Sequence, residues 1–366
     1  GGSVRQLRLF LEGLAGDEIQ AGVISYYGGA MGAELLSVEG LFARFALGVR
    51  RSPAPDTIKY VGARWFPTPF FIWYAVAVLW MVMRHRPDVM YLNNLPQQHL
   101  PAIVVARWLG LPVISHLRAV RPLTAADRWA LPYVDRFLAV SASARNHFIT
   151  EGVDADKVAV AYNIMPLADF DRIAQGGCDV AFESDAGYVV QVGRLDRNKR
   201  PLLAIDALAQ ALEGCSSLKL ILIGDGELEE EVARVVEARG LCDRVVQLGP
   251  RGDVPAVLAR CHIGLLLSQS EGFGNVVLEY MAARLPVVVT DIPSIDEMAV
   301  RGETAWVLED DSPQAIASLL VRLGRDPDLR RAMGLRGRRK LENSPFVRLF
   351  HDDPRLAFMR KVAKRE

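Results

Sequence analysis

Two glutamates eight positions apart, Glu271 and Glu279, are the side chains of this sequence whose type and spacing best suit the binding of a polar ligand. Glycines between them let a backbone approach a ligand closely. Free backbone amides at the start of the following helix favour an anion, and they belong to Phe273, Gly274, Asn275 and Val276. Carboxylates beside an anion site suit a ligand with both hydroxyl and phosphate groups, and a nucleotide-sugar has both.

The two glutamates are expected to lie on one parallel crossover unit. Apolar run length and turn residues predict a buried strand over 263–267, a loop over 268–274, a helix over about 276–284 capped by Asn275, and a second buried strand over 286–290. Glu271 then lies on the loop and Glu279 one turn into the helix. Since ligands bind such units at the carboxyl ends of the strands, both carboxylates are expected at the mouth of one crevice.

The segment from Glu271 to Glu279 resembles the Glu-x7-Glu motif of the family 4 retaining glycosyltransferases, which have the GT-B fold. The resemblance implies that Glu271 contacts the donor sugar, that the intervening amides hold its diphosphate, and that Glu279 binds the ribose. The alternative is an ordinary crossover unit with two solvated glutamates.

A second block, Gly193-Arg-Leu-Asp-Arg-Asn-Lys-Arg-Pro201, follows a predicted strand over 188–192. Arg194 offers a planar fork and Lys199 a point charge, and both suit a diphosphate. Fixed cations of this kind also stabilise the charge that grows on a departing phosphate. The block resembles the family's Gly-Arg-Leu and Lys pattern, and the alternative is a solvated basic turn.

Three further residues are assigned to the donor side by the resemblance. Gly224 and Gly226 follow a predicted strand over 218–223 and match the family's glycines beside the nucleotide. Arg251 follows a strand over 245–248, where the family's backbone meets the base. A Gly-x-Gly-x-x-Gly pattern is not present in the sequence, which argues against a dinucleotide site.

In the N-terminal half, polar residues follow two predicted strands, over 89–92 and 112–115. Asn93 stands at the end of the first strand, and His116 and Arg118 stand at the end of the second. The resemblance places a histidine of this kind close to the donor sugar, whereas Arg118 suits an acceptor or a phosphate. A satisfied structural histidine is the alternative for His116.

The sequence begins Gly1-Gly2-Ser3 and continues with a helical pattern. The family has a first strand, a Gly-Gly loop and then such a helix. We therefore expect Gly1 and Gly2 to be what remains of an acceptor-side loop whose strand is missing. A cloning remnant is the alternative.

Residues 70–83 are fourteen apolar residues without a charge. The run is too short to span a bilayer, which needs about 20 residues. One interpretation is a helix buried on all sides. The other is an interfacial helix whose face, with Trp73, Ala77 and Trp80 and the basic Arg84 and Arg86, rests weakly on the cytoplasmic membrane leaflet that carries a lipid-linked acceptor.

Composition narrows the class of protein. The 366 residues carry 43 basic and 43 acidic side chains, so nothing in the charge favours nucleic acid as a partner. The four cysteines have no metal-ligand spacing and indicate reduced thiols in the cytoplasm. Asp154 and Asp156 lie on a predicted turn and are expected to be solvated, so we expect no metal site.

These patterns together predict an α/β protein with the GT-B fold, in which two doubly wound Rossmann-like domains face each other across a cleft. The predicted parts are an acceptor-side domain over 1–168 to which a C-terminal helix over 346–366 returns, a linker over 169–187, and a nucleotide-sugar-binding domain over 188–345.

The implied activity is metal-independent transfer, with retained configuration, of a sugar from a UDP- or GDP-linked donor to a glycan or lipid-linked acceptor. No cofactor is expected. The setting would be bacterial surface-polysaccharide or lipopolysaccharide assembly, in the cytoplasm or peripherally on the inner face of its membrane. The expected catalytic residues are Glu271, His116, Arg194 and Lys199. The alternatives are a nonhydrolysing sugar-nucleotide epimerase and an inactive donor-binding subunit.

Overall fold

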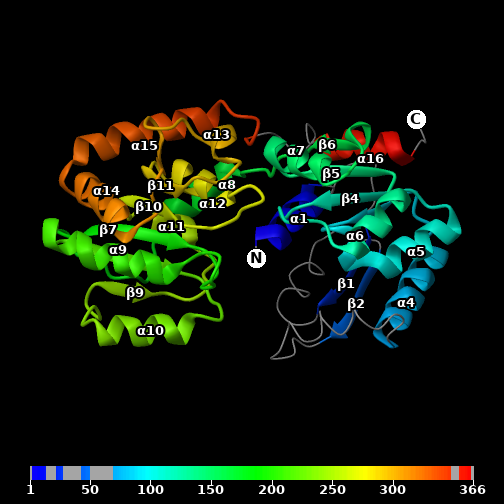
Figure 1. The fold of residues 1–366 in the computed structure, drawn as a ribbon, viewed down its shortest axis with the longest axis horizontal. Coiled ribbons are helices and arrows are strands. Elements are labelled where there is room, and N and C mark those ends of the chain that lie inside the picture. Colours follow the sequence, from blue (N-terminus) through cyan, green and yellow to red (C-terminus); the bar gives the residue numbers. More distant parts are fainter. Residues whose placement is uncertain (1, 14–21, 28–42, 50–68, 348–353, 364–366) are drawn as a thin grey trace. The chain divides into compact units, whose positions relative to one another are not determined.

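The chain folds into two compact units, each built on a parallel sheet (Figure 1). The computed structural model describes residues 2–13, 22–27, 43–49, 69–347 and 354–363. The first unit comprises Gly1–Ile164 and Arg348–Glu366, and the second comprises Met165–Val347.

The first unit contains a four-stranded parallel sheet in the order β3-β4-β5-β6. Its strands are β3 (Met90–Leu92), β4 (Val113–Leu117), β5 (Arg136–Ala139) and β6 (Val158–Val160). Two further strands, β1 (Gly22–Tyr27) and β2 (Ala43–Val49), pair in parallel with each other. All five residues of β4 are buried, as expected for a central strand covered on both faces.

Helices of the first unit alternate with these strands. They are α1 (Gly2–Gly13), α4 (Pro69–His85), α5 (Leu100–Leu109), α6 (Ala125–Ala130), α7 (Ala142–Thr150) and α16 (Pro354–Ala363), with short 3-10 helices η1 (Pro96–His99), η2 (Leu131–Tyr133) and η3 (Ala155–Lys157). Helix α16 packs on the sheet, where Phe358 and Met359 contact the buried Ile114 and Leu138. The last helix therefore belongs to the N-terminal unit.

The second unit contains a six-stranded parallel sheet in the order β12-β11-β10-β7-β8-β9. Its strands are β7 (Gly187–Val192), β8 (Leu218–Ile223), β9 (Val245–Gln247), β10 (Ile263–Leu266), β11 (Val287–Thr290) and β12 (Ala305–Leu308). Strands β7 to β9 extend the sheet in one direction and β10 to β12 in the other. The carboxyl ends of β7 and β10 therefore form the topological switch point, where open α/β sheets bind ligands.

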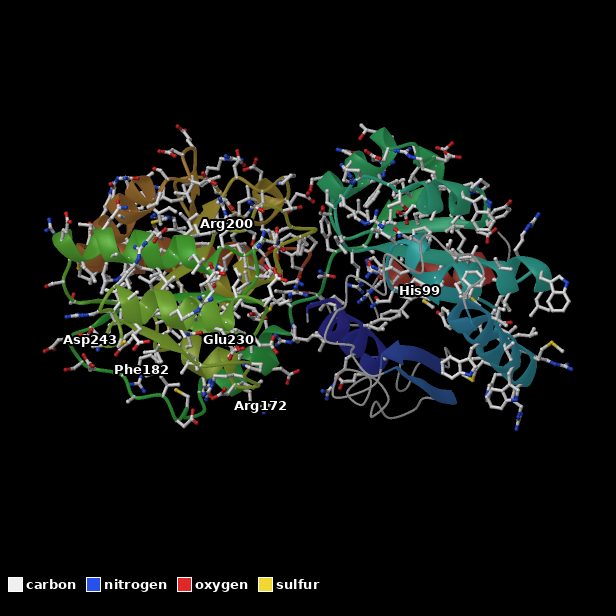
Figure 2. All side chains as sticks on the ribbon, turned by 60° about the horizontal axis from the view of Figure 1, so that its bottom comes forward. His99, Arg172, Phe182, Arg200, Glu230 and Asp243 are labelled. Atoms are coloured by element: carbon white, nitrogen blue, oxygen red, sulfur yellow. The ribbon has the colours of Figure 1, made fainter. Side chains whose placement is uncertain are left out.

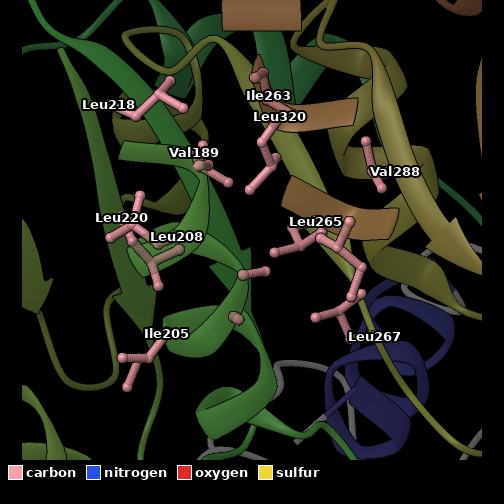
Figure 3. Close-up of a cluster of buried hydrophobic side chains, with 14 of the residues drawn as sticks. Val189, Ile205, Leu208, Leu218, Leu220, Ile263, Leu265, Leu267, Val288 and Leu320 are labelled. Atoms are coloured by element: carbon pink, nitrogen blue, oxygen red, sulfur yellow. The ribbon is translucent and has the colours of Figure 1, made fainter. Parts of the chain in front are cut away.

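Helices cover this second sheet, and a continuous apolar core lies beneath them. They are α8 (Leu167–Ala174), α9 (Pro201–Gly214), α10 (Glu229–Ala238), α11 (Val254–Leu258), α12 (Asn275–Ala282), α13 (Ile295–Met298), α14 (Pro313–Arg325) and α15 (Pro327–Glu342). The core joins Val189 and Leu265 of the sheet to Leu208 of α9 and Leu320 of α14 (Figure 3). Burial of these side chains is the main force that holds the helices on the sheet.

The predicted linker over 169–187 differs from the structure. Its first part is helix α8 of the second unit, with Phe170 buried and Asp171 paired with Arg338 of α15. Two hydrogen bonds of 2.7 and 2.6 Å join the guanidinium to both carboxylate oxygens. The polar composition of this segment favoured a linker over a helix. The reason is that Asp171 pairs with Arg338, 167 positions away, which the local sequence does not show.

The predicted α/β class is confirmed, with two domains that each contain a parallel sheet. Most predicted strands agree with the structure to within one or two residues, and the one over 218–223 agrees fully. The strand predicted over 112–115 is longer than expected and ends at Leu117.

Candidate nucleotide-sugar site

One tyrosine forms hydrogen bonds with both central strands at the switch point of the second sheet. Tyr280 of α12 is fully buried, and its hydroxyl lies 3.2 Å from the carbonyl of Val190 in β7 and 3.1 Å from that of Leu265 in β10. It also accepts a hydrogen bond of 3.0 Å from the amide of Val192. Gly264 makes room for this ring, since a Cβ there would lie 2.4 Å from Tyr280 Cγ. Tyr280 therefore holds together the two strands whose ends carry the site.

Lys199 is fixed through its own backbone. Its amide donates to Asp196 Oδ1 at 2.9 Å, and its carbonyl accepts from the buried Gln191 Nε2 at 2.6 Å. The following residue, Arg200, adopts a left-handed conformation (φ 51°), and Pro201 then begins α9. The Lys199 backbone therefore has a defined position before any ligand arrives.

Arg200, labelled in Figure 2, lies in the second unit. It ties this loop to the neighbouring strand. Its Nε donates to the carbonyl of Leu267, directly after β10, and its guanidinium pairs with Asp311. No role was predicted for Gln191, Asp196, Arg200 or Tyr280. Of these four residues, only Gln191 could have been noticed in the sequence, because it is a polar residue within the apolar strand 187–192.

The Lys199 ammonium forms an ion pair with Glu271, which lies 72 positions further along the chain. Their side chains are only 19% and 15% exposed. Partial burial weakens the screening by water, so the two charges interact more strongly than an exposed pair would. The structure thus brings together two of the predicted catalytic residues at the carboxyl ends of β7 and β10.

Arg194 lies on the same loop but has a different partner. Its side chain is 62% exposed, and Nε donates to Asp196 Oδ2 at 2.9 Å. Asp196 therefore receives hydrogen bonds from both Arg194 and the Lys199 amide. The proposed contact of Arg194 with a diphosphate stays a prediction.

Gly224 and Gly226 are required by backbone packing. A Cβ on Gly224 would lie 1.9 Å from the carbonyl oxygen of Gly193, and one on Gly226 would lie 2.3 Å from that of Leu195. The amide of Leu195 also donates to the Asp225 carbonyl at 2.8 Å. These glycines therefore let the loops after β7 and β8 lie against each other, and their contact with a nucleotide stays a prediction.

Helix α12 begins one residue earlier than predicted, because Gly274 and not Asn275 is its N-cap. Gly274 has φ 88°, a conformation that favours glycine, and Asn275 is the first helical residue. Phe273 is buried, its carbonyl accepts from Ser294 Oγ at 2.8 Å, and its ring meets Phe346 edge-on at 5.3 Å. Val276 is buried in the first turn, and Glu279 is partly exposed one turn further on. Their predicted donor contacts are untested.

The Arg251 guanidinium is occupied by carboxylates. It donates to Asp253 at 2.8 and 2.7 Å and also pairs with Asp179. These hydrogen bonds raise the pKa of Arg251 further above its ordinary value. A contact with a base would therefore use the backbone here, which is what the family resemblance implied.

In the first unit, polar residues meet at the carboxyl edge of the sheet. Arg118 donates through Nε to Asn93 Oδ1 at 2.6 Å and through Nη1 to Asn163 Oδ1 at 3.0 Å. These residues follow β3, β4 and β6. The predicted acceptor-side residues Asn93 and Arg118 are thus neighbours, and Asn163 joins them. Gly2 is the first residue of α1, and Gly1 lies outside the described residues.

His116 lies within β4 and not at its end. It is fully buried, and Nδ1 shares a hydrogen bond with the Tyr91 hydroxyl. Burial, followed by the charges of Arg118 and Arg355, holds the pKa of His116 well below its ordinary value, although the Ala161 backbone acts in the opposite direction. The imidazole is therefore neutral near pH 7, and its catalytic role stays a prediction.

A second feature of the first unit is a group of exposed apolar side chains on two neighbouring helices, which we call the α4–α5 surface. Its exposed side chains are Ile72, Trp73, Val76, Trp80 and Met83 of α4 and Val104, Trp108 and Leu109 of α5, and the two helices pack against each other. The prediction of a helix buried on all sides is therefore wrong. The predicted interfacial face was also wrong at Ala77, which is only 7% exposed.

Basic residues border the α4–α5 surface. Arg84, Arg86 and Arg107 are exposed, and neither helix contains an acidic residue. Within the part of the chain that the structure describes, no helix has the length and apolar character needed to cross a membrane. Among the same residues, no group of three histidine, cysteine, aspartate or glutamate side chains could hold a metal ion.

Two family models match almost the whole chain. The model for glycosyltransferase family 4 matches residues 1–168, and the model for glycosyl transferases group 1 matches residues 179–340. The chain therefore belongs to the family 4 glycosyltransferases, as the resemblance of its motifs implied.

Individual relatives and solved structures agree with this family. The chain is 31% identical over 150 residues to N-acetyl-alpha-D-glucosaminyl L-malate synthase of Bacillus anthracis, a match that covers 41% of this chain and 39% of the relative. It is 29% identical over 181 residues to a Campylobacter jejuni enzyme named N-acetylgalactosamine-N,N'-diacetylbacillosaminyl-diphospho-undecaprenol 4-alpha-N-acetylgalactosaminyltransferase, with 49% and 48% covered. The chain thus spans less than half the length of these relatives.

The fold is also that of Anabaena Alr3699/HepE in its crystal structure with UDP-glucose. The TM-score is 0.76 at 20% identity, and the match covers 99% of this chain and 96% of the other. The structural neighbours are GT-B glycosyltransferases, so the predicted fold class is confirmed.

Proposed function

We propose that this protein is a retaining glycosyltransferase that transfers a sugar from a nucleotide-diphosphate sugar to an acceptor without a metal ion. The observation that carries the proposal is the Lys199–Glu271 ion pair at the switch point, directly before helix α12. One cation and one carboxylate lie side by side where a diphosphate and the hydroxyls of its sugar would meet.

Each charged group would have a distinct task. Lys199 and Arg194 would neutralise the diphosphate, and the amides at the start of α12 would share that role. Glu271 would orient the hydroxyls of the donor sugar, and Glu279 would bind the ribose. The growing charge of the leaving group is then stabilised by fixed cations and dipoles.

No side chain is assigned as a covalent nucleophile. The acceptor hydroxyl would attack C1 of the sugar on the face that the diphosphate leaves. The bond from C1 to the phosphate oxygen breaks as the bond to the acceptor oxygen forms, and the departing phosphate takes the proton of the acceptor. Attack on that face retains the anomeric configuration.

The acceptor would be a lipid-linked glycan at the inner face of the cytoplasmic membrane, in the assembly of a surface polysaccharide. The α4–α5 surface supports this part of the proposal, because its exposed tryptophans and bordering arginines suit an anionic leaflet. The name of the Campylobacter jejuni relative also includes a diphospho-undecaprenol compound.

A donor and acceptor panel tests the reaction. The protein would be incubated with UDP- and GDP-sugars and undecaprenyl-diphosphate-linked glycans, and the product linkage would be read by NMR. We expect one donor to yield nucleoside diphosphate and a product of retained configuration, and Glu271→Gln to slow that reaction. An inverted product, an epimer formed without an acceptor, or donor hydrolysis alone would contradict the proposal.

A further inference from the structure

We infer that Asn198 is a positioning residue that holds Glu271 opposite Lys199 by pairing with the backbone of Ser270. Its side-chain Nδ2 donates to the Ser270 carbonyl at 3.0 Å, and its Oδ1 accepts from the Ser270 amide at 3.0 Å. The Asn198 carbonyl also accepts from the amide of Gln269 at 2.9 Å. We call these three hydrogen bonds the Asn198 clamp.

The Asn198 clamp joins the loop after β7 to the loop after β10. An asparagine amide presents a donor and an acceptor side by side, so it can satisfy both backbone groups of one residue at once. Lys199 directly follows Asn198, and Glu271 directly follows Ser270. The clamp therefore aligns the two loops at the residues that directly precede Lys199 and Glu271.

The two sides of the ion pair are held differently. The Lys199 backbone is fixed within its own loop by Asp196 and Gln191. Glu271 lies in the middle of the loop between β10 and α12, whose ends are held at Ser268 by Thr290 (2.7 Å) and at Phe273 by Ser294 (2.8 Å). Between these ends, the Asn198 clamp ties Gln269 and Ser270 to the neighbouring loop. Removal of the Asn198 side chain thus leaves the Lys199 backbone fixed and removes both hydrogen bonds to Ser270, the residue before Glu271, while the Asn198 carbonyl still accepts from the Gln269 amide.

The catalytic consequence rests on the proposed function, in which Glu271 orients the donor sugar. A catalytic group that must be ordered during the reaction accelerates it less than a preorganised group does. Asn198→Ala should therefore lower kcat by about tenfold. It should change the Kd of the free nucleoside diphosphate by less than about threefold, because that ligand lacks the sugar that Glu271 contacts.

A double-mutant cycle tests whether Asn198 acts through Glu271. We expect Asn198→Ala to lower kcat by about tenfold in the native protein and by less than about twofold in a Glu271→Gln background. Equal losses in the two backgrounds would overturn the inference, because a purely structural role is additive. Asn343→Ala is the matched control. Asn343 donates to the Arg339 carbonyl at 2.8 Å at the end of α15, and its loss should leave kcat unchanged.

Amide hydrogen exchange tests the Asn198 clamp without any assay of activity. In Asn198→Ala, the Ser270 amide should exchange faster because it loses its side-chain acceptor, whereas the amides of 193–197 should keep their native rates. Unchanged exchange at the Ser270 amide would overturn the clamp. If the native protein transfers no sugar, the proposed function fails and this measurement still decides whether Asn198 holds the loop.

Discussion

Charge reversal on the α4–α5 surface should release the protein from anionic membranes. The change is Arg84→Glu, Arg86→Glu and Arg107→Glu, three exposed arginines beside the exposed tryptophans. A basic residue near an anionic leaflet contributes about 1 kcal/mol. Loss of three such contributions amounts to about 3 kcal/mol, or roughly two orders of magnitude in the partition coefficient. Repulsion by the new carboxylates adds to this loss.

Co-sedimentation with vesicles of mixed phosphatidylglycerol and phosphatidylcholine measures the effect. Binding of the native protein should weaken as salt rises, because exposed charges are screened within about 10 Å at 0.1 M. The matched control reverses three exposed arginines of the second unit, Arg234, Arg325 and Arg331, and changes the net charge equally. This control should bind nearly as well as the native protein.

Two results would refute the reasoning. A native protein that stays in the supernatant at low salt would mean that the α4–α5 surface is not a membrane contact. Equal losses in the variant and its control would mean that net charge alone governs binding. Replacement of Trp80 and Trp108 by Ser separates the apolar part, because it should lower the binding that remains at high salt.

Three other perturbations have defined outcomes. Lys199→Ala should lower turnover by about ten- to a hundredfold, since a hydrogen bond to a charged group contributes roughly 1.5–3 kcal/mol. Lys219→Ala, which breaks the pair with Glu183 in the same unit, should leave turnover unchanged, and equal rates for the two variants would exclude the assigned role. Transfer should persist in excess chelator, because in the proposed reaction Lys199 and Arg194 would supply the positive charge for the leaving group, and a loss restored by Mg²⁺ or Mn²⁺ would contradict this. Asp171→Asn should lower the free energy of unfolding by about 1–2 kcal/mol near pH 7, since Asp171 is partly screened by water. Its hydrogen bonds with Arg338 hold the pKa of Asp171 below the ordinary value, so this contribution is present above about pH 4 and is lost as pH falls through the folded pKa. A difference between the two proteins that stays constant in denaturant titrations down to pH 3 would contradict the assignment.

The residues of the site could be predicted singly because each follows a strand. Glu271 and Lys199 stand in the loops that follow apolar runs, and parallel sheets place such loops at one edge. Their pairing could not be predicted, because it depends on β7 and β10 being neighbours in the sheet although two strands separate them in sequence. The contribution of Asn198 could not be predicted for the same reason, since its partners lie about 70 positions away.

Segments of uniform composition were harder to predict. The fourteen apolar residues 70–83 contain no polar residue that marks a face, so the exposure of Trp80 and the burial of Ala77 depend on where α5 packs. Conversely, α8 was hidden in a polar stretch because Asp171 is matched by the distant Arg338. His116 was placed at a strand end because its polarity suggested one, whereas the Tyr91 hydroxyl partners it inside β4.

Calorimetric titration of nucleotides tests the central claim, that the switch point of the second unit holds a nucleotide diphosphate through Lys199. The account predicts that UDP or GDP binds at least about tenfold more tightly than its monophosphate, because a second phosphate gains a charge-assisted contact. Lys199→Ala should remove most of that difference and leave monophosphate binding nearly unchanged. Failure of both diphosphates to bind, or a diphosphate preference that survives in Lys199→Ala, would contradict the account.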